Sequence, residues 1–143
     1  YVQKNIFEPC GMKNSTSCEI GNISSVPKSD DYMATAESAR GAGDIHSNVC
    51  DILLWDRALM SGKLLDEEQM QYLTTMQNGY SCGWMSLKND AIGHNGSTMS
   101  YIVDNVILQV EGIGRVYVVV MVSDHQEAYN LQALTGIVKE VLK

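Results

Sequence analysis

The chain has 143 residues, of which 17 are acidic and 10 are basic, so its formal net charge is −7. Apolar residues make up 45% and charged residues 19%, which is typical of one globular domain and excludes a disordered chain. An acidic chain is not expected to bind nucleic acid, because neutralising phosphates needs a surplus of Lys and Arg. The longest strongly apolar run, residues 116–122, is too short to span a membrane.

The chain begins within an expected helix. Residues 1–8 read as the end of a helix, and the first residue is Tyr1 rather than Met, so we expect the chain to be part of a longer protein. Residues 9–46 are rich in Gly, Ser, Asn and Asp and contain several turn signals. So long an irregular stretch is typical of a functional loop or of a loop packed against another segment.

Two helices are expected next. Ser47 can cap the first, whose apolar residues recur at helical spacing until Gly62 ends the run. Asp66 and Gln69 resemble a capping pair at the start of the second. The apolar stripes on both helices are interpreted as core-facing surfaces: Val49, Ile52, Leu53, Leu59 and Met60 on the first, and Met70, Leu73 and Met76 on the second.

From Gly79 onward the sequence favours strands. Residues 80–87 are expected to form one strand, residues 99–110 a long strand and residues 115–122 an apolar strand. A short Gly-containing turn separates the last two, so we expect them to pair antiparallel.

A last helix is expected to begin at Ser123 or Asp124 and to cover one face of the sheet. The predicted fold class is therefore α+β: antiparallel strands with a C-terminal helix packed on the sheet, plus a helical and loop region. We assign the whole chain, residues 1–143, to one domain. Its first part, residues 1–79, is helical and loop-rich, and residues 80–143 carry the sheet and the last helix.

The cysteines indicate neither a metal site nor a particular disulfide. Cys10, Cys18, Cys50 and Cys82 contain no C-x-x-C spacing, so no structural zinc site is expected, and three full disulfide pairings remain open. His46 and Cys50 would share a helix face at i, i+4, which is a metal-ligand spacing. The favoured interpretation is a His near the helix cap and a small buried Cys. No cofactor is expected.

Residues 93–98, with the sequence GHNGST, lie between two expected strands. Taken alone, Asn95 and Gly96 are a strong hairpin-turn signal. The wider sequence provides a second interpretation.

Several segments, in chain order, resemble the class C β-lactamase and penicillin-binding protein family of active-site serine hydrolases. They are IFEPCGM at residues 6–12, GAGDIHS at 41–47, DILLW at 51–55, SGKLL at 61–65, YSCGW at 80–84 and HNG at 94–96. The family pattern at the first segment is I-F-x-P-L-G-M, with Cys10 here in place of Leu. The last segment falls where the family has its K-T-G or H-x-G motif.

The resemblance implies a partial β-lactamase/transpeptidase-like fold and acyl-enzyme chemistry on a β-lactam, a D-amino-acid peptide or an ester. His94 would lie on the strand that borders the cleft and would bind a substrate carboxylate or assist proton transfer. The backbone N–H of Ser97 would be one oxyanion-hole donor. Asn95, Gly96 and Ser97 would line the substrate, with Gly96 allowing close backbone approach.

The family's nucleophile motif, S-x-x-K, has no acceptable match in this chain. Its one occurrence, residues 25–28, lies in a turn-rich stretch with Pro at the third position, and neither Y-x-N nor S-x-N occurs. The serine, its lysine and the second motif are therefore expected upstream of Tyr1, and the chain alone is expected to be inactive.

Two further expectations follow from the resemblance. Family members are often exported to the cell envelope or secreted. Without the strands that precede this part in the family, the sheet would be incomplete, which favours self-association or association with the missing N-terminal part. The alternative to an enzyme is a non-catalytic module of the same fold that binds peptidoglycan-like peptides or a protein partner.

Overall fold

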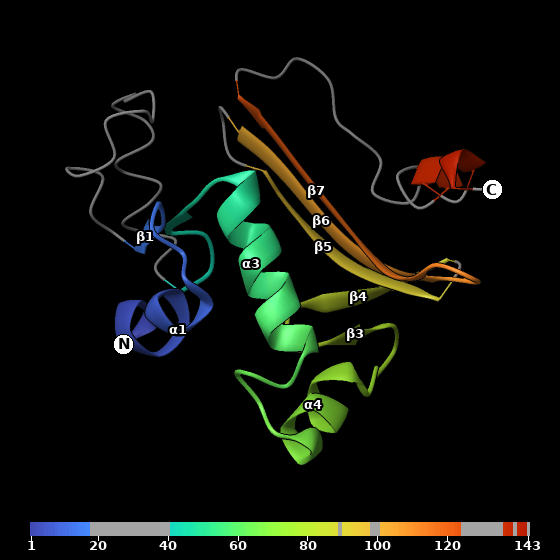
Figure 1. Cartoon of the computed structure of the whole chain (residues 1–143), viewed down its shortest axis with the longest axis horizontal. Coiled ribbons are helices and arrows are strands. Elements are labelled where there is room, and N and C mark those ends of the chain that lie inside the picture. The colour runs from blue at the N-terminus through green and yellow to red at the C-terminus, as the bar shows by residue number, and fades with distance from the viewer. Residues whose placement is uncertain (18–40, 89, 98–100, 124–135, 139, 143) are drawn as a thin grey trace.

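The computed structural model describes residues 1–17, 41–88, 90–97, 101–123, 136–138 and 140–142. Its helices and strands follow in chain order (Figure 1): η1 (Gln3–Phe7), α1 (Glu8–Cys10), β1 (Thr16–Ser17), β2 (Ile45–His46), α3 (Val49–Met60), α4 (Glu67–Thr74), β3 (Tyr80–Ser81), β4 (Trp84–Leu87), β5 (Ala91–Ser97), β6 (Tyr101–Val110) and β7 (Gly114–Ser123).

The N-terminal helix is the predicted one. The π-helical turn η1 continues directly into α1, which ends at Gly11 in the left-handed conformation, with φ 77°. Phe7, Cys10 and Met12 from this segment are buried against Ala58 of α3. The first residues of the chain are therefore fixed by packing against the central helix.

Helix α3 is capped by Asn48, so the expectation of Ser47 as its cap is wrong. The Asn48 side chain accepts a hydrogen bond of 2.9 Å from the backbone N–H of Asp51. The Ser47 hydroxyl instead lies 2.7 Å from that of Ser15. Either side chain suits an N-cap, and the contact between Ser47 and the preceding segment leaves Asn48 in the extended conformation that a cap requires.

Asp51, in the first turn of α3, ties the helix to the preceding segment. Its side chain is buried, and Oδ2 accepts hydrogen bonds from the backbone N–H of Asn14 at 2.7 Å and from the Ser15 hydroxyl at 2.8 Å. Two donors thus satisfy a carboxylate that would be costly to bury alone.

Helix α4 has the predicted capping box. The Asp66 side chain accepts from the backbone N–H of Gln69 at 2.8 Å, and the Gln69 side chain accepts from the backbone N–H of Asp66 at 3.0 Å. The reciprocal pair satisfies two N–H groups that the first helical turn leaves without partners.

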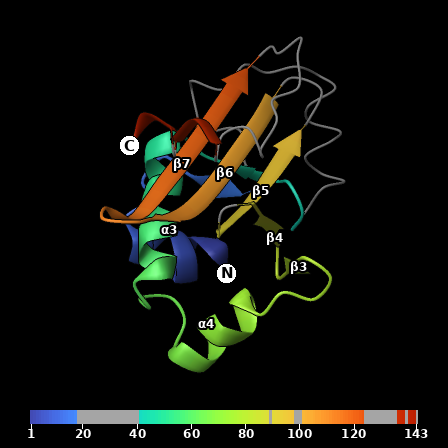
Figure 2. The same ribbon diagram turned by 90° about the vertical axis from the view of Figure 1, so that its right-hand side faces the viewer.

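The main sheet has the order β3-β4-β5-β6-β7, and every neighbouring pair is antiparallel (Figure 2). The predicted antiparallel pairing of the last two long strands is confirmed. Strands β1 and β2 form a separate two-stranded sheet near the start of α3.

The single strand expected over residues 80–87 is instead a tight hairpin. Cys82 and Gly83 connect β3 to β4, and both have positive φ, 46° and 90°. Two central residues with positive φ are typical of the two-residue turns that match the twist of paired strands. Cys82 is therefore an exposed turn residue and not part of a continuous strand over residues 80–87.

Helix α3 and the end of the chain lie on opposite sides of the long strands (Figure 1). On one side, Val138 packs against a buried cluster of Leu87, Ala91, Val106 and Leu108. On the other side, Leu59 of α3 packs with Trp84 and Ile107.

The predicted α+β class, an antiparallel sheet with a C-terminal helical segment on one face, is therefore confirmed. The expected start of the last helix, at Ser123 or Asp124, falls at the edge of residues 124–135, which are outside the described residues. The division of the domain between residues 79 and 80 stays a prediction. Among the described residues, no helix is both long and apolar enough to cross a membrane.

Candidate active site

The predicted site residues lie on an extended strand. His94, Asn95, Gly96 and Ser97 form the second half of β5 and pair with β6. The hairpin turn expected at Asn95 and Gly96 from their local sequence is therefore wrong. Pairing with the long apolar strand β6 outweighs the local turn preference of these two residues.

Gly93, just before His94, lies where the backbones of β5 and β6 and the side chains beneath them approach closely. A Cβ atom added at Gly93 would lie 2.7 Å from the carbonyl oxygen of Asn105 and 2.8 Å from Cδ1 of Leu87. At Gly96, an added Cβ would have nothing within 4 Å. The two strands therefore approach closely at Gly93, and the close approach of a substrate at Gly96 stays a prediction.

His94 is exposed, and its partner is a tyrosine from the hairpin. The Tyr80 hydroxyl lies 3.3 Å from Nε2 of His94, and the two rings meet edge to face, with centroids 6.1 Å apart. Tyr80 is itself half-exposed. Sequence reasoning missed Tyr80 as a site residue, although it begins the YSCGW segment. The missing signal was the turn at Cys82, which folds β3 back beside β4.

One edge of β5 is open beside His94. Strand β4 pairs with β5 only as far as Gly93, so within the described chain His94, Asn95 and Gly96 have no strand partner on that side. In an antiparallel sheet, alternate residues direct their N–H and C=O groups toward opposite neighbours. This edge therefore presents backbone hydrogen-bonding groups next to an exposed imidazole.

A buried polar pair joins α3 to strand β6, which is the neighbour of the strand that carries His94. Nδ2 of Asn105 donates a 2.7 Å hydrogen bond to Oδ1 of Asp56, and both residues are buried. Burial raises the pKa of Asp56 to about 7, and the bond from Asn105 opposes that rise. Asn105 is also the cross-strand partner of His94.

Asp104, next to Asn105 in β6, is a second buried carboxyl. It is fully buried, and neither oxygen has a hydrogen-bond partner among the described residues. Burial raises its pKa. Asp104 is the cross-strand partner of Asn95, so both carboxyls lie near the predicted site residues.

His46 and Cys50 do not share a helix face. His46 is buried in β2, where burial lowers its pKa, whereas Cys50 is exposed in the first turn of α3. The favoured small buried Cys at position 50 is therefore also wrong. Of the four cysteines, Cys10, Cys50 and Cys82 are free thiols, and Cys18 is outside the described residues. Within the described ranges, no group of three or more His, Cys, Asp or Glu residues can hold a metal.

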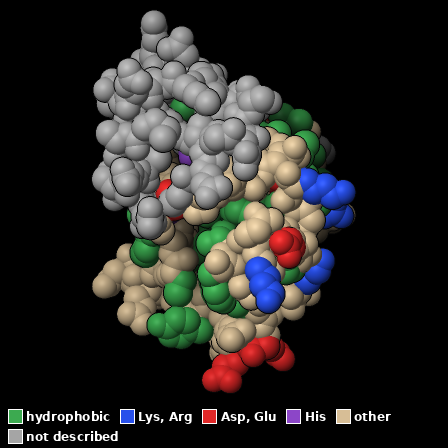
Figure 3. Space-filling view, turned by 90° about the vertical axis from the view of Figure 1, so that its left-hand side faces the viewer, with side chains coloured by type: hydrophobic (Ala, Val, Ile, Leu, Met, Phe, Trp, Pro, Cys, Tyr) green, Lys and Arg blue, Asp and Glu red, His purple; other side chains and the backbone are tan. Residues whose placement is uncertain are grey.

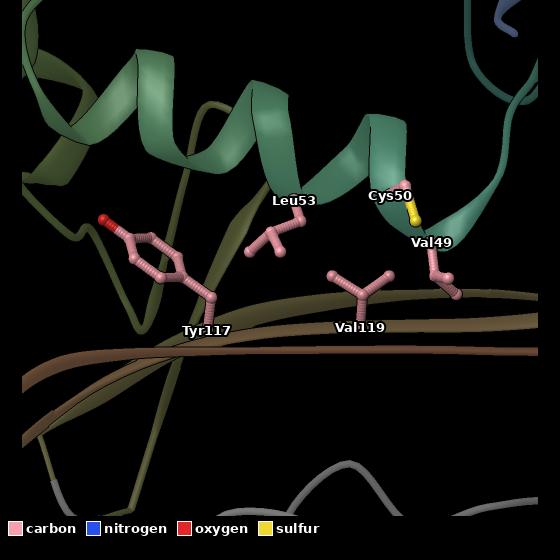
Figure 4. A pocket seen from close by; sticks show the side chains of 5 residues that line it. All are labelled: Val49, Cys50, Leu53, Tyr117 and Val119. Carbon is pink, nitrogen blue, oxygen red and sulfur yellow. The ribbon is translucent and has the colours of Figure 1, made fainter.

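An apolar hollow of about 240 Å³ lies elsewhere, between α3 and β7 (Figure 4). Its lining residues, which point toward one another from the helix and the strand, are Val49, Cys50, Leu53, Tyr117 and Val119. None of the predicted site residues lines it. The S-x-x-K occurrence at residues 25–28 is outside the described residues.

The face of the molecule seen in Figure 3 carries hydrophobic side chains at its surface, with Lys and Arg gathered along one flank. Large apolar residues of α3 contribute to the exposed surface of the molecule, including Val49, Leu53 and Leu54. A face of this kind is typical of a domain that buries more surface against another segment.

Solved structures of D-amino acid amidase from Ochrobactrum anthropi SV3 match almost the whole chain. The TM-score is 0.63 at 18% identity for the complex with D-phenylalanine, and 0.65 at 17% identity for the complex with L-phenylalanine. Each match covers 99% of this chain but only 50% and 51%, respectively, of the amidase chain. The chain has the fold of one half of D-amino acid amidase.

This similarity confirms the predicted partial β-lactamase/transpeptidase-like fold. It does not distinguish the class C enzymes from other proteins of that fold. No protein-family model matches the chain, and no curated protein does.

Proposed function

We propose that this chain is the C-terminal half of a serine hydrolase that cleaves an amide or ester bond through an acyl-enzyme. The support is that 99% of the chain matches half of the D-amino acid amidase fold, together with the exposed His94 beside an open strand edge. In this chemistry a serine oxygen attacks the carbonyl carbon, a base takes its proton, the amine or alcohol leaves, and water then hydrolyses the ester.

His94 is proposed as the ionisable group of this half. It is exposed and contacts the Tyr80 hydroxyl, so its ring is held edge-on while one side remains open to a ligand. An imidazole can bind a substrate carboxylate or transfer a proton to the leaving group. Tyr80 is proposed as the residue that sets the orientation of this ring.

The β5 edge is proposed as the surface along which the substrate lies. An extended peptide-like substrate can add to an open strand edge through backbone hydrogen bonds. Residues 94–96 supply such an edge, and the N–H of Ser97 is proposed as one donor of the oxyanion hole. This favours a D-amino acid amide, a D-amino-acid peptide or a β-lactam, which all carry a backbone-like amide.

The attacking serine is proposed to come from polypeptide that completes the fold. The chain spans about half of the amidase length, and its one S-x-x-K occurrence, residues 25–28, lies outside the described residues. We propose that this other half packs on the exposed apolar surface of α3 and along β7, either within the same polypeptide or by association.

The decisive experiment compares the 143-residue chain with the longest protein that its reading frame encodes. Each is incubated with a chromogenic D-amino acid anilide, an ester and a cephalosporin, and acylation is followed by mass spectrometry. We expect no turnover by the 143-residue chain. The longer protein should hydrolyse one of these substrates and gain a covalent acyl group on a serine of an S-x-x-K motif.

Two variants of the longer protein test the site. His94→Ala should lower kcat/KM by about 100-fold or more if the ring takes part in proton transfer. Tyr80→Phe should reduce kcat/KM less, and Tyr72→Phe, at an exposed tyrosine of α4, is the matched control. Binding without turnover, or a reading frame that encodes no S-x-x-K, would favour a non-catalytic binding module instead.

A further inference from the structure

Asp56 and Asn105 form a buried pair in which two oxygens lack a hydrogen-bond partner. One added proton would allow these two oxygens to form a hydrogen bond with each other. Asp56 is 0% exposed and Asn105 is 7% exposed. They share one hydrogen bond, from Nδ2 of Asn105 to Oδ1 of Asp56, at 2.7 Å. The other two oxygens, Oδ2 of Asp56 and Oδ1 of Asn105, are buried, and neither has a hydrogen-bond partner in the described part of the chain.

The two oxygens cannot bond to each other while the carboxyl is ionised, because both are acceptors. If the carboxyl carries its proton, however, Oδ2 becomes a donor that can face Oδ1 of Asn105. A carboxylic acid and a primary amide then form a two-point pair, with one hydrogen bond in each direction. In such a pair both oxygens gain a hydrogen-bond partner, and no other group is needed. Without these hydrogen bonds, the two buried oxygens would destabilise the folded chain.

We propose that Asp56 is held in the folded protein as a neutral carboxylic acid in a two-point pair with Asn105, and that this pair positions the strand that carries His94. The second part rests on the proposed function, because it concerns the site that His94 would serve. The first part stands on the contact geometry alone.

The surroundings of Asp56 favour the neutral form. Burial is the largest cause of its raised pKa of about 7. The packed elements carry several other ionisable residues, and none of them is hydrogen-bonded to Asp56: Cys50, Asp51 and Arg57 on α3, His94 on β5, Tyr101 and Asp104 on β6, and Arg115 and Tyr117 on β7. The Arg115 guanidinium instead donates to a main-chain carbonyl at the end of α3, at 2.9 Å.

The link to the site is the register of the sheet. Asn105 lies directly opposite His94, and directly opposed residues in antiparallel strands have Cβ atoms about 5 Å apart. Asn105 is therefore the neighbour of His94 across the strand pair, and its side chain is hydrogen-bonded to a residue of α3. Because α3 holds Asn105 through Asp56, the position of β5 at His94 depends on that bond.

The protonation state is tested by NMR on the isotope-labelled 143-residue chain. The carboxyl carbon of Asp56 should titrate with a midpoint near 7, and the side-chain amide protons of Asn105 should shift at the same midpoint. In His94→Gln the Asn105 transition should persist, because it reports Asp56 rather than the imidazole. A carboxyl midpoint near 4 for Asp56 would overturn the neutral pair.

The two-point pair is also tested by an isosteric substitution with a matched control on the same helix. Asp56→Asn should preserve both bonds as an amide pair. At pH 8, which lies above both the folded pKa of about 7 and the unfolded pKa near 4, its unfolding equilibrium constant should be about 1,000-fold smaller than that of the unsubstituted chain, with only about a twofold difference at pH 4. Asp51→Asn should raise the unfolding constant at both pH values, because Asp51 accepts from two donors. Equal destabilisation by both substitutions would refute the pair.

The positioning role is tested by a measurement that a loss of stability alone would not change. Asp56→Leu fills the space but has no bond to Asn105, so the ring resonances of Tyr80 and His94 should shift, whereas Asp56→Asn should restore them. Unchanged ring resonances in a folded Asp56→Leu chain would show that the pair does not position the site. These measurements use no substrate, so a failure of the proposed hydrolase activity would leave their outcome unaffected.

Discussion

The indole rings of Trp55 and Trp84 stack 5.7 Å apart with only 7° between their planes, which joins α3 to β4. Trp84 is 3% exposed and belongs to the cluster that includes Leu59 and Ile107. β4 is also the second strand of the hairpin that carries Tyr80. The stack therefore connects the central helix to the element that contacts His94.

Replacing Trp84 with Ala should lower the free energy of unfolding by about 3–5 kcal/mol, because a buried aromatic side chain is lost and a cavity remains. Urea unfolding followed by circular dichroism measures this change. Tyr72→Ala, at a 73% exposed aromatic residue, should change the free energy of unfolding by less than about 0.5 kcal/mol. A loss below about 1 kcal/mol at Trp84 would contradict the packing described here.

Gly93→Ala should destabilise the chain, whereas Gly96→Ala should not. A Cβ at Gly93 meets backbone and a packed side chain closer than 3.0 Å, so β5 must move away from β6, at a cost of about 1–3 kcal/mol. The Cβ at Gly96 points into open space. Thermal unfolding of both variants, which carry the same substitution on one strand, checks the difference. Similar melting temperatures would count against the close approach at Gly93.

Cys82→Asn should stabilise the hairpin. Cys82 has a φ of 46°, a conformation that is costly for most side chains and that Asn adopts more readily. We expect a gain of several tenths to about 1 kcal/mol in the free energy of unfolding, measured by urea titration under reducing conditions. Cys82→Val should be destabilising, since a branched side chain disfavours positive φ. If Val were tolerated as well as Asn, the turn would have a different conformation.

Asp104→Asn should raise stability near neutral pH. Burial raises the pKa of Asp104, so the folded chain keeps its proton at pH values where the unfolded chain, with an ordinary Asp pKa near 4, has lost it. The free energy of unfolding therefore falls as pH rises above the Asp104 pKa of the unfolded chain. The loss is complete once pH passes the Asp104 pKa of the folded chain. The variant should therefore be more stable than the unsubstituted chain at pH 8, and the two should be equally stable below pH 4. Denaturation of both proteins at several pH values in this range measures the difference. A gain that did not change with pH would exclude ionisation of Asp104 as its cause.

The sequence pattern predicted those helices and strands whose own local residues are enough to specify them. The two long strands and their turn, the capping box at Asp66 and Gln69, and the N-terminal helix all have strong local signals. The choice between Ser47 and Asn48 as the helix cap was not predictable in this way. Both residues suit the position, and a contact with Ser15, distant in sequence, distinguishes them.

The candidate site shows the same limit. Asn95 and Gly96 carry a turn signal, yet pairing with β6 extends them, and only the order of motifs along the chain pointed to a strand. Tyr80 was not predicted as a partner of His94, because a turn at Cys82 has no Gly or Asn at its first position to signal it. Asp56 and Asn105 are 49 residues apart, and neither has a pattern that predicts a buried pair.

Among the described strands, β7 has a neighbour on one side only, although it is ten residues long and half of its residues are Val. Such an edge is a template for uncontrolled strand addition between molecules. In concentrated solution, these 143 residues by themselves should therefore tend to associate through that edge unless something shields it, so dilute samples suit the measurements above.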